Sequence, residues 1–161
     1  MPEIYPVGMA EMRIAQTPAF LAAYGIGSCV IVAMYDSKTK IGGLAHVMLP
    51  DSSGIQQDRV NPKKFADTAI PLLFQTLSHA GIYRGNAWVK LVGGAEMFPP
   101  TEDFSDNIGK QNCHAVESAV KKLGIPILAK ELGGKVARSM ELSLETGVIS
   151  IVVLGDSRKE I

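Results

Sequence analysis

The chain has 161 residues, and its sixteen basic and sixteen acidic residues cancel to a net charge of zero at pH 7. A chain of this length can bury about 70% of the surface of its unfolded state, so we expect a single domain over residues 1–161. Lys and Arg never form a run of more than two, which argues against the electrostatic footprint of a protein that binds nucleic acid or anionic lipid.

The compartment can be predicted from what the sequence lacks. No segment approaches the ~20 apolar residues that a membrane-spanning helix needs, and no basic segment followed by an apolar one opens the chain, as it would in a secretory signal. We therefore expect a cytoplasmic location without direct membrane insertion. In that compartment Cys29 and Cys113, the two cysteines, are expected to be free thiols.

Residues 30–35 and 41–49 are two short apolar runs with a polar stretch between them. This pattern predicts a β-hairpin. With Ser37 and Lys38 as a two-residue turn, Cys29 faces His46 across the hairpin. Directly opposed side chains share one face of a sheet with their Cβ atoms about 4.5–5.5 Å apart, so we expect the thiol and the imidazole to meet.

Two further segments have the helical period of three and four residues. The first begins at Asn61-Pro62 and ends at Gly81, and Pro71 is expected to kink or interrupt it. The second runs from about residue 111 to residue 123, before Gly124. Both helices are amphipathic, so each is expected to cover a sheet.

The remaining apolar segments predict strands. Residues 88–92 form one, and residues 140–144 and 148–153 form a second hairpin around a Gly-containing turn. Strands that are apolar on both faces, with at least two covering helices, indicate an α+β fold. We predict a layered α/β sandwich with mixed or antiparallel sheets flanked by helices.

The loop before Cys29 favours nucleophilic chemistry. Gly25-Ile26-Gly27-Ser28 permits a tight turn whose backbone N–H groups can face a ligand, so Gly27 and Ser28, with the Gly93-Gly94 loop, are candidates for support of the site and its oxyanion hole. An adjacent imidazole can hold a cysteine as its thiolate and then protonate a leaving group. Cys29 and His46 are therefore the candidate nucleophile and general base of a thiol amidohydrolase.

Less specific interpretations compete with this one. A cysteine at the edge of an apolar strand, or a single histidine, is more often structural than catalytic. Gly25-Ile26-Gly27 is a poor dinucleotide fingerprint, because Val30 occupies the third glycine position and a strand is expected to follow. The three histidines show no metal-ligand spacing, so we expect neither a metal nor another cofactor.

Several motifs are arranged in order along the chain. They are Gly25-Ile26-Gly27-Ser28-Cys29-Val30, Ala45-His46-Val47-Met48-Leu49-Pro50-Asp51-Ser52, Lys64-Phe65-Ala66-Asp67-Thr68-Ala69, Gly93-Gly94-Ala95-Glu96-Met97-Phe98, Asn107-Ile108-Gly109, Gly133-Gly134 and Glu145-Thr146-Gly147. With the spacing between the cysteine and the histidine, they resemble the chemoreceptor glutamine deamidases of bacterial and archaeal chemotaxis, the CheD family. The resemblance extends from about residue 7 to residue 153.

The resemblance implies a hydrolase that converts glutamine side chains of methyl-accepting chemotaxis receptors to glutamate. The family's nucleophile falls on Cys29 and its base on His46. It also implies a fold similar to that of deamidating-toxin-like cysteine hydrolases. The implied partners are the cytoplasmic domains of chemoreceptors and a CheC-type phosphatase that docks on the deamidase.

Two positions depart from the family pattern. The family's third catalytic residue is a threonine six positions before the cysteine, where this chain has Ala23, and Gln111 stands where arginine is usual. Without that hydroxyl, either Ser28, Tyr24 or a backbone carbonyl orients His46, or activity is reduced. Two other functions stay open: a catalytically weakened module that mainly binds and regulates a CheC-type phosphatase, and a thiol hydrolase or transglutaminase-like enzyme acting on another amide.

Overall fold

The computed structural model describes residues 1–97, 107–153, 155 and 158–161. Phe98, the last residue of the motif that begins at Gly93, lies outside them. Within the described part of the chain, two helices and ten strands are formed. In chain order they are β1 (Glu3–Pro6), β2 (Met12–Gln16), β3 (Ala19–Ile26), β4 (Val30–Asp36), β5 (Ile41–Val47), α1 (Ala66–Ala80), β6 (Ala87–Gly93), α2 (Ile108–Leu123), β7 (Ile127–Leu132), β8 (Arg138–Ser143), β9 (Ile149–Val153) and β10 (Arg158–Glu160).

The strands form two mixed five-stranded sheets. Sheet A has the order β1-β3-β8-β9-β10, and sheet B has the order β2-β5-β4-β6-β7. In each sheet one edge strand is parallel to its neighbour, β1 to β3 and β7 to β6, and the other pairs are antiparallel. The prediction of an α+β layered sandwich with mixed sheets is confirmed.

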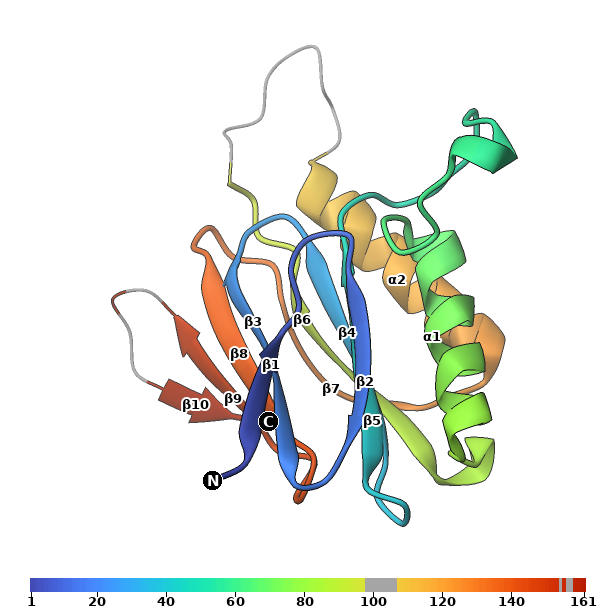
Figure 1. Cartoon of the computed structure of the whole chain (residues 1–161). Helices are drawn as coiled ribbons and strands as arrows, with labels where there is room; N and C mark the ends of the chain where they lie inside the picture. The colour runs from blue at the N-terminus through green and yellow to red at the C-terminus, as the bar shows by residue number, and fades with distance from the viewer. Residues whose placement is uncertain (98–106, 154, 156–157) are drawn as a thin grey trace.

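Two clusters of buried side chains define three layers (Figure 1). One cluster fills the space between the two sheets and includes Leu21, Ile31 and Met140. The other lies between sheet B and the two helices and includes Val32 and Val116. Both helices thus cover the same face of sheet B. Because sheet B contributes a face to each cluster, we propose that residues 1–161 form one domain.

The central strand β4 explains why its segment has so continuous an apolar pattern. All seven of its residues are buried, because alternate side chains point to opposite faces and each face of sheet B is covered. Val30 and Val32 pack toward the helices, whereas Ile31 and Ala33 pack toward sheet A. Cys29, one residue before β4, also belongs to the cluster between the sheets.

The β4–β5 hairpin is confirmed, but its predicted register is wrong by two residues. His46 lies opposite Ile31, and not opposite Cys29. The turn contains residues 37–40 instead of two residues, because the Asp36 carboxylate accepts hydrogen bonds from the backbone N–H groups of the turn and stabilises the longer form. A shift of two residues keeps a side chain on the same face of the sheet, so His46 still points between the sheets.

The helices differ from their predictions at their first residues. α1 begins at Ala66, and the Asn61 side chain instead accepts a hydrogen bond from the Lys63 N–H in the loop before it. Its end before Gly81, which adopts φ 114°, is confirmed. Pro71 lies within α1 and does not interrupt it. α2 begins three residues earlier than predicted because the Asn107 side chain caps it by accepting from the Gly109 N–H.

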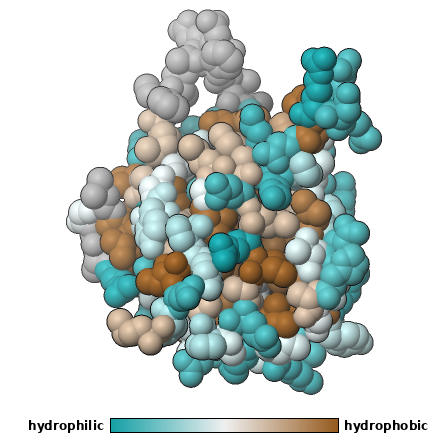
Figure 2. All heavy atoms as spheres, viewed as in Figure 1, coloured by the Kyte–Doolittle hydropathy of each residue, from teal (hydrophilic) through white to brown (hydrophobic). Residues whose placement is uncertain are grey.

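The loop between β5 and α1 projects from the body of the molecule. It contains a short 3-10 turn at Gln57–Arg59, all three residues of which are exposed. Figure 2 shows this projection as a mainly hydrophilic surface. Among the described residues, neither helix has the length and apolar character needed to cross a membrane.

Candidate active site

Cys29 lies where the chain passes from one sheet to the other. Residues 27–29 connect the end of β3 in sheet A to the start of β4 in sheet B. The Cys29 side chain is only 8% exposed and faces a pocket of about 530 Å³. The pocket is lined by Pro6, Val7, Gly8, Met9, Tyr24, Gly25, Gly27, Ser28, Cys29, His46 and Met97.

His46 comes to the same pocket from β5. It is 3% exposed, and its Nδ1 lies 3.0 Å from the carbonyl oxygen of Val7. A carbonyl oxygen only accepts hydrogen bonds, so Nδ1 carries the proton in the neutral ring and Nε2 is the basic nitrogen. The structure thus brings the two predicted residues into one pocket and fixes the tautomer of the histidine.

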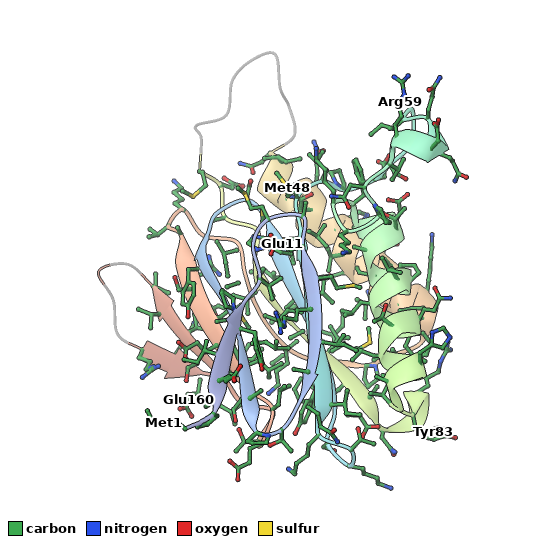
Figure 3. All side chains as sticks on the ribbon, viewed as in Figure 1. Met1, Glu11, Met48, Arg59, Tyr83 and Glu160 are labelled. Atoms are coloured by element: carbon green, nitrogen blue, oxygen red, sulfur yellow. The ribbon has the colours of Figure 1, made fainter. Side chains whose placement is uncertain are left out.

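Residues 7–11, which connect β1 to β2, hold His46 from one side. The Val7 N–H donates to the Ala22 carbonyl at 2.8 Å, which anchors the segment to sheet A. The backbone of His46 donates to Glu11 and accepts from Ala10, each at 3.0 Å. Figure 3 shows Glu11 and Met48 toward the same end of the molecule. This segment was missed in the sequence, because a backbone carbonyl leaves no signature in side-chain types.

The loop that carries Cys29 is held by three hydrogen bonds to consecutive carbonyl oxygens. Gly27 accepts from the Ala95 N–H at 2.9 Å and Cys29 accepts from the Gly94 N–H at 2.7 Å. Ser28 accepts from the Asn112 side-chain amide at 3.0 Å. Among the described residues, no hydrogen-bond partner in another residue is found for the N–H groups of Ser28 and Cys29.

The electrostatics of the pair differ from the thiolate expected from the sequence. Burial raises the pKa of the Cys29 thiol, and its own backbone N–H only partly opposes that effect. Burial also lowers the pKa of His46, with a smaller opposing effect of the Val7 carbonyl and of Glu11. Both shifts favour neutral groups. The two shifts thus favour a neutral thiol and a neutral imidazole over a thiolate–imidazolium pair.

The lowered pKa of His46 predicts how stability depends on pH. In the unfolded chain the imidazole takes up a proton near pH 6.5, whereas the folded protein resists protonation below that value. The unfolded state then binds more protons, so the free energy of unfolding falls as the pH drops below about 6.5. Urea unfolding of the wild type and of His46→Gln between pH 5 and pH 8 checks this prediction. The free energy of unfolding should fall more steeply toward acid in the wild type than in the variant. The same dependence on pH in both proteins would contradict it.

Gly93 and Gly94 pack against the cysteine loop. Gly93 has φ 127°, and a Cβ there would collide with the Cys29 carbonyl oxygen and lie 2.9 Å from the Ile26 side chain. Gly94 has φ 68°, and its added Cβ would collide with the Cys113 sulfur. Since the Gly94 N–H is donated to the Cys29 carbonyl, this loop supports the backbone of the candidate nucleophile.

Gly93→Ala is expected to destabilise the fold by about 3 kcal/mol or more, because strained φ and a backbone collision act together. The collision displaces the Cys29 carbonyl, so turnover by the remaining folded protein should fall as well. Chemical denaturation and a deamidation assay measure the two effects. If Gly93→Ala unfolds with the same free energy as the wild type, residue 93 does not pack closely against the Cys29 carbonyl oxygen.

Ala23 is fully buried between the sheets, where it pairs with Met140 of β8. It offers no hydroxyl, and the observed partner of the His46 ring is the Val7 carbonyl. Of the alternatives open from the sequence, the structure contains the backbone carbonyl. Ser28 and Tyr24 line the pocket, but no hydrogen bond from either to His46 is formed.

Ala23→Thr is therefore expected to add no activity, because the Nδ1 proton of His46 already has an acceptor. Two extra heavy atoms in a filled core typically cost about 1–3 kcal/mol. Thermal unfolding and turnover on the same preparation check this prediction. A gain in turnover of tenfold or more would show that the carbonyl orients the ring poorly.

The other residues singled out in the sequence lie elsewhere. Cys113 is a half-buried free thiol on α2 beside Gly94, with its pKa raised by burial. Gln111 is in the first turn of α2, where its N–H donates to the Asn107 carbonyl. Within the part of the chain that the structure describes, no group of three or more His, Cys, Asp or Glu residues could hold a metal ion.

Comparison with known proteins assigns a family to this geometry. A family model described as CheD chemotactic sensory transduction matches residues 48–152. The chain belongs to the CheD family. The matched part begins after Cys29 and His46, so the model match does not itself extend to the candidate pair. It does include the Gly93-Gly94 loop and Asn112.

Individual CheD proteins are similar over almost the whole chain. A protein of Clostridium kluyveri, named probable chemoreceptor glutamine deamidase CheD, is 42% identical over 160 residues, which are 96% of each chain. One of Moorella thermoacetica with the same name is 42% identical, covering 99% of this chain and 96% of its own. The chemoreceptor glutamine deamidase CheD of Halalkalibacterium halodurans is 39% identical over 100% of both chains.

Proposed function

We propose that this chain is a chemoreceptor glutamine deamidase, which hydrolyses glutamine side chains of receptor cytoplasmic domains to glutamate and ammonia. Membership in the CheD family and the names of its relatives support the activity and the substrate class. The observation that carries the chemistry is the shared pocket of Cys29 and His46, with the Val7 carbonyl holding the imidazole so that Nε2 is the basic nitrogen. This arrangement gives a nucleophile and an oriented base in one place.

In the first half of the proposed reaction, Cys29 attacks the side-chain carbonyl carbon of the glutamine. The Sγ proton passes to His46 Nε2 as the carbon–sulfur bond forms, because the resting thiol is neutral. The carbonyl oxygen becomes an oxyanion, and the N–H groups of Ser28 and Cys29 are its proposed donors. His46 then returns the proton to the amide nitrogen, ammonia leaves, and a thioester remains on Cys29.

In the second half, water replaces ammonia. His46 Nε2 removes a proton from the water molecule as its oxygen attacks the thioester carbon. The carbon–sulfur bond breaks, Cys29 recovers a proton from His46, and the product is glutamate. The carboxylic acid that forms ionises in water and the released ammonia takes up a proton, so the sum is one amide and one water converted to one carboxylate and one ammonium ion. Every proton transfer within the site uses His46, and the proposal requires no cofactor.

The rim of the pocket suits a side chain presented by another protein. Met9, Tyr24 and Met97 line the pocket and are 63%, 54% and 43% exposed. Apolar and amphipathic side chains around a small opening can contact the residues next to a target glutamine while the amide reaches Cys29. We therefore propose that the protein acts in the cytoplasm, where receptor cytoplasmic domains are available.

Two alternatives differ from this proposal in their products. A weakened module that mainly regulates a CheC-type phosphatase would bind partners and release little ammonia. The bond from His46 to the Val7 carbonyl removes the main reason for expecting such weakness, namely the missing hydroxyl at Ala23. A thiol hydrolase or transglutaminase-like enzyme would use the same pair on another amide. We retain the CheC-type phosphatase as a proposed partner of the active enzyme.

The proposed function is tested by incubating the wild-type protein with a chemoreceptor cytoplasmic domain and measuring both ammonia and the mass of receptor peptides. Conversion of particular glutamines to glutamate, with one ammonia per conversion, is the expected result. Binding without conversion would favour the regulatory module. Ammonia release accompanied by cross-linking to an amine would favour a transglutaminase-like reaction. A receptor domain incubated alone controls for spontaneous deamidation.

A further inference from the structure

Asn112 is a buried polar residue in the second turn of α2 whose side chain reaches both segments of the candidate site. It is 0% exposed. Its Nδ2 donates one hydrogen bond to the Ser28 carbonyl at 3.0 Å and another to the Met48 carbonyl at 2.9 Å. Ser28 directly precedes Cys29, and Met48 follows His46 by two residues. One amide nitrogen therefore links the loop of the nucleophile to the end of the strand that carries the base.

The bond to the Ser28 carbonyl fixes the direction in which the Cys29 N–H points. In a trans peptide the carbonyl of one residue and the N–H of the next point in opposite directions. Because the Ser28 carbonyl points to Asn112, the Cys29 N–H points away from α2. This N–H has no bonding partner among the other described residues. It lies close enough to the Cys29 sulfur to oppose in part the rise in the thiol pKa that burial causes.

We propose that Asn112 is a positioning residue that holds the Ser28–Cys29 peptide so that the Cys29 N–H serves as an oxyanion donor. Its second bond, to the Met48 carbonyl, holds this peptide in place relative to the strand that carries His46. The inference rests on the proposed function, since it concerns the oxyanion formed in that reaction. Asn112 does not touch the substrate. It acts through the two carbonyl oxygens that it binds.

The chemistry of the side chain explains why an amide is suited to this position. Two carbonyl oxygens converge on one buried point, and each needs a donor. An amide NH₂ group supplies two N–H donors from one nitrogen, whereas a carboxylate supplies none and a hydroxyl supplies one. Leu has a similar size and no donor at all. Asn112→Leu therefore removes both bonds while it fills most of the same space.

The position of α2 does not depend on Asn112 alone. Val116 and Val120 of the same helix are buried in the cluster between the helices and sheet B, and Gly109 packs against the carbonyl of Ala95. Val116→Ala is thus a matched control. Val116 lies one turn further along α2 and is equally buried. Its replacement by alanine removes packing in the cluster between the helices and sheet B and leaves both hydrogen bonds of Asn112 in place.

The test compares two reactions of Cys29, of which only one requires an oxyanion donor. Deamidation of a receptor cytoplasmic domain passes through an oxyanion, whereas alkylation by iodoacetamide does not. In Asn112→Leu we expect kcat to fall about 10²-fold, the scale found when one oxyanion donor is lost, with KM within about threefold. The rate of Cys29 alkylation, followed on the Cys29 peptide by mass spectrometry from pH 6 to pH 10, should stay within about threefold.

A second variant, Asn112→Ser, can be measured if Asn112→Leu does not fold. Asn112→Ser is small enough for the site and can serve at most one of the two carbonyls, so its kcat should lie between those of the wild type and of Asn112→Leu. Thermal unfolding of all variants, with Val116→Ala as the comparison, separates lost stability from lost positioning. Val116→Ala should keep a kcat within about threefold of wild type.

Several results would overturn the proposal. A kcat within threefold of wild type in both Asn112 variants would show that the bonds do not matter for turnover. Equal losses of kcat and of Cys29 alkylation would show that Asn112 only maintains the fold of the loop. The wild-type rate tests the proposed function separately. A folded wild type that does not deamidate the receptor domain would contradict that function, and the positioning role of Asn112 with it.

Discussion

Cys29→Ala is expected to lower deamidation at least about 10⁴-fold while the protein stays folded. The thiol is the only protein group in the proposed reaction that forms a bond to the substrate carbon, and removal of a catalytic nucleophile can cost about 10⁶ in kcat. Alanine retains the Cβ and leaves the three carbonyl anchors of the loop unchanged, because those bonds use backbone atoms. Ammonia release at equal protein concentrations measures the effect.

Cys113→Ser is the matched control for this substitution. Cys113 is the other free cysteine and lies on α2 beside Gly94, outside the pocket of Cys29. Its replacement should leave kcat within about threefold of wild type. If Cys113→Ser abolishes turnover and Cys29→Ala does not, the nucleophile has been assigned to the wrong thiol.

His46→Gln is expected to lower kcat by about 10²–10⁴-fold, the usual contribution of a general acid–base residue. The loss should lie toward the upper end, because burial raises the pKa of Cys29 and a neutral thiol needs a base. Gln is a neutral polar side chain of similar length to His, so the fold should be retained. It has no basic nitrogen, however, and cannot take the proton from the sulfur.

The pH profile of kcat/KM gives a second signature of His46. Since burial lowers its pKa, the acidic limb of the wild-type profile should fall below pH 6.5, where an ordinary histidine would titrate. In His46→Gln this limb should vanish, and residual activity should rise toward alkaline pH as Cys29 ionises. An unchanged acidic limb in the variant would assign the base to another residue.

The sequence predicted correctly that Cys29 and His46 share one face of the sheet, but not which residues pair across the hairpin. Side chains alternate with a period of two along a strand, so a register error of two residues, from Cys29 to Ile31 opposite His46, preserved the shared face. The turn length could not be read because it depends on the Asp36 carboxylate, which accepts two backbone N–H groups. Asp is common in turns of several lengths.

The strands near the N-terminus have only a weak pattern in the sequence. β1 (Glu3–Pro6) and β2 (Met12–Gln16) are short edge strands and are largely exposed or half-buried. Such strands lack the continuous apolar pattern of β4. The loop between them supplies the Val7 carbonyl, so the part of the site that orients His46 came from the segment with the weakest pattern.

Burial also acts against the expected thiolate. An imidazole near a thiol stabilises the ion pair only if the surroundings tolerate charge. Cys29 and His46 are both almost fully buried, and burial shifts both pKa values toward the neutral forms. Burial at the junction of two sheets is a property of the tertiary fold, which the local pattern around Cys29 did not reveal.

The central claim is that Cys29 forms a covalent thioester with the glutamine side chain. The most direct measurement is the intact mass of the protein after a short reaction with a receptor-derived glutamine peptide and an acid quench. The account predicts an adduct equal to the peptide less one ammonia, located on the Cys29 peptide, present in Cys113→Ser and absent in Cys29→Ala. Glutamate formation at full rate by Cys29→Ala, or an adduct on another residue, would contradict it.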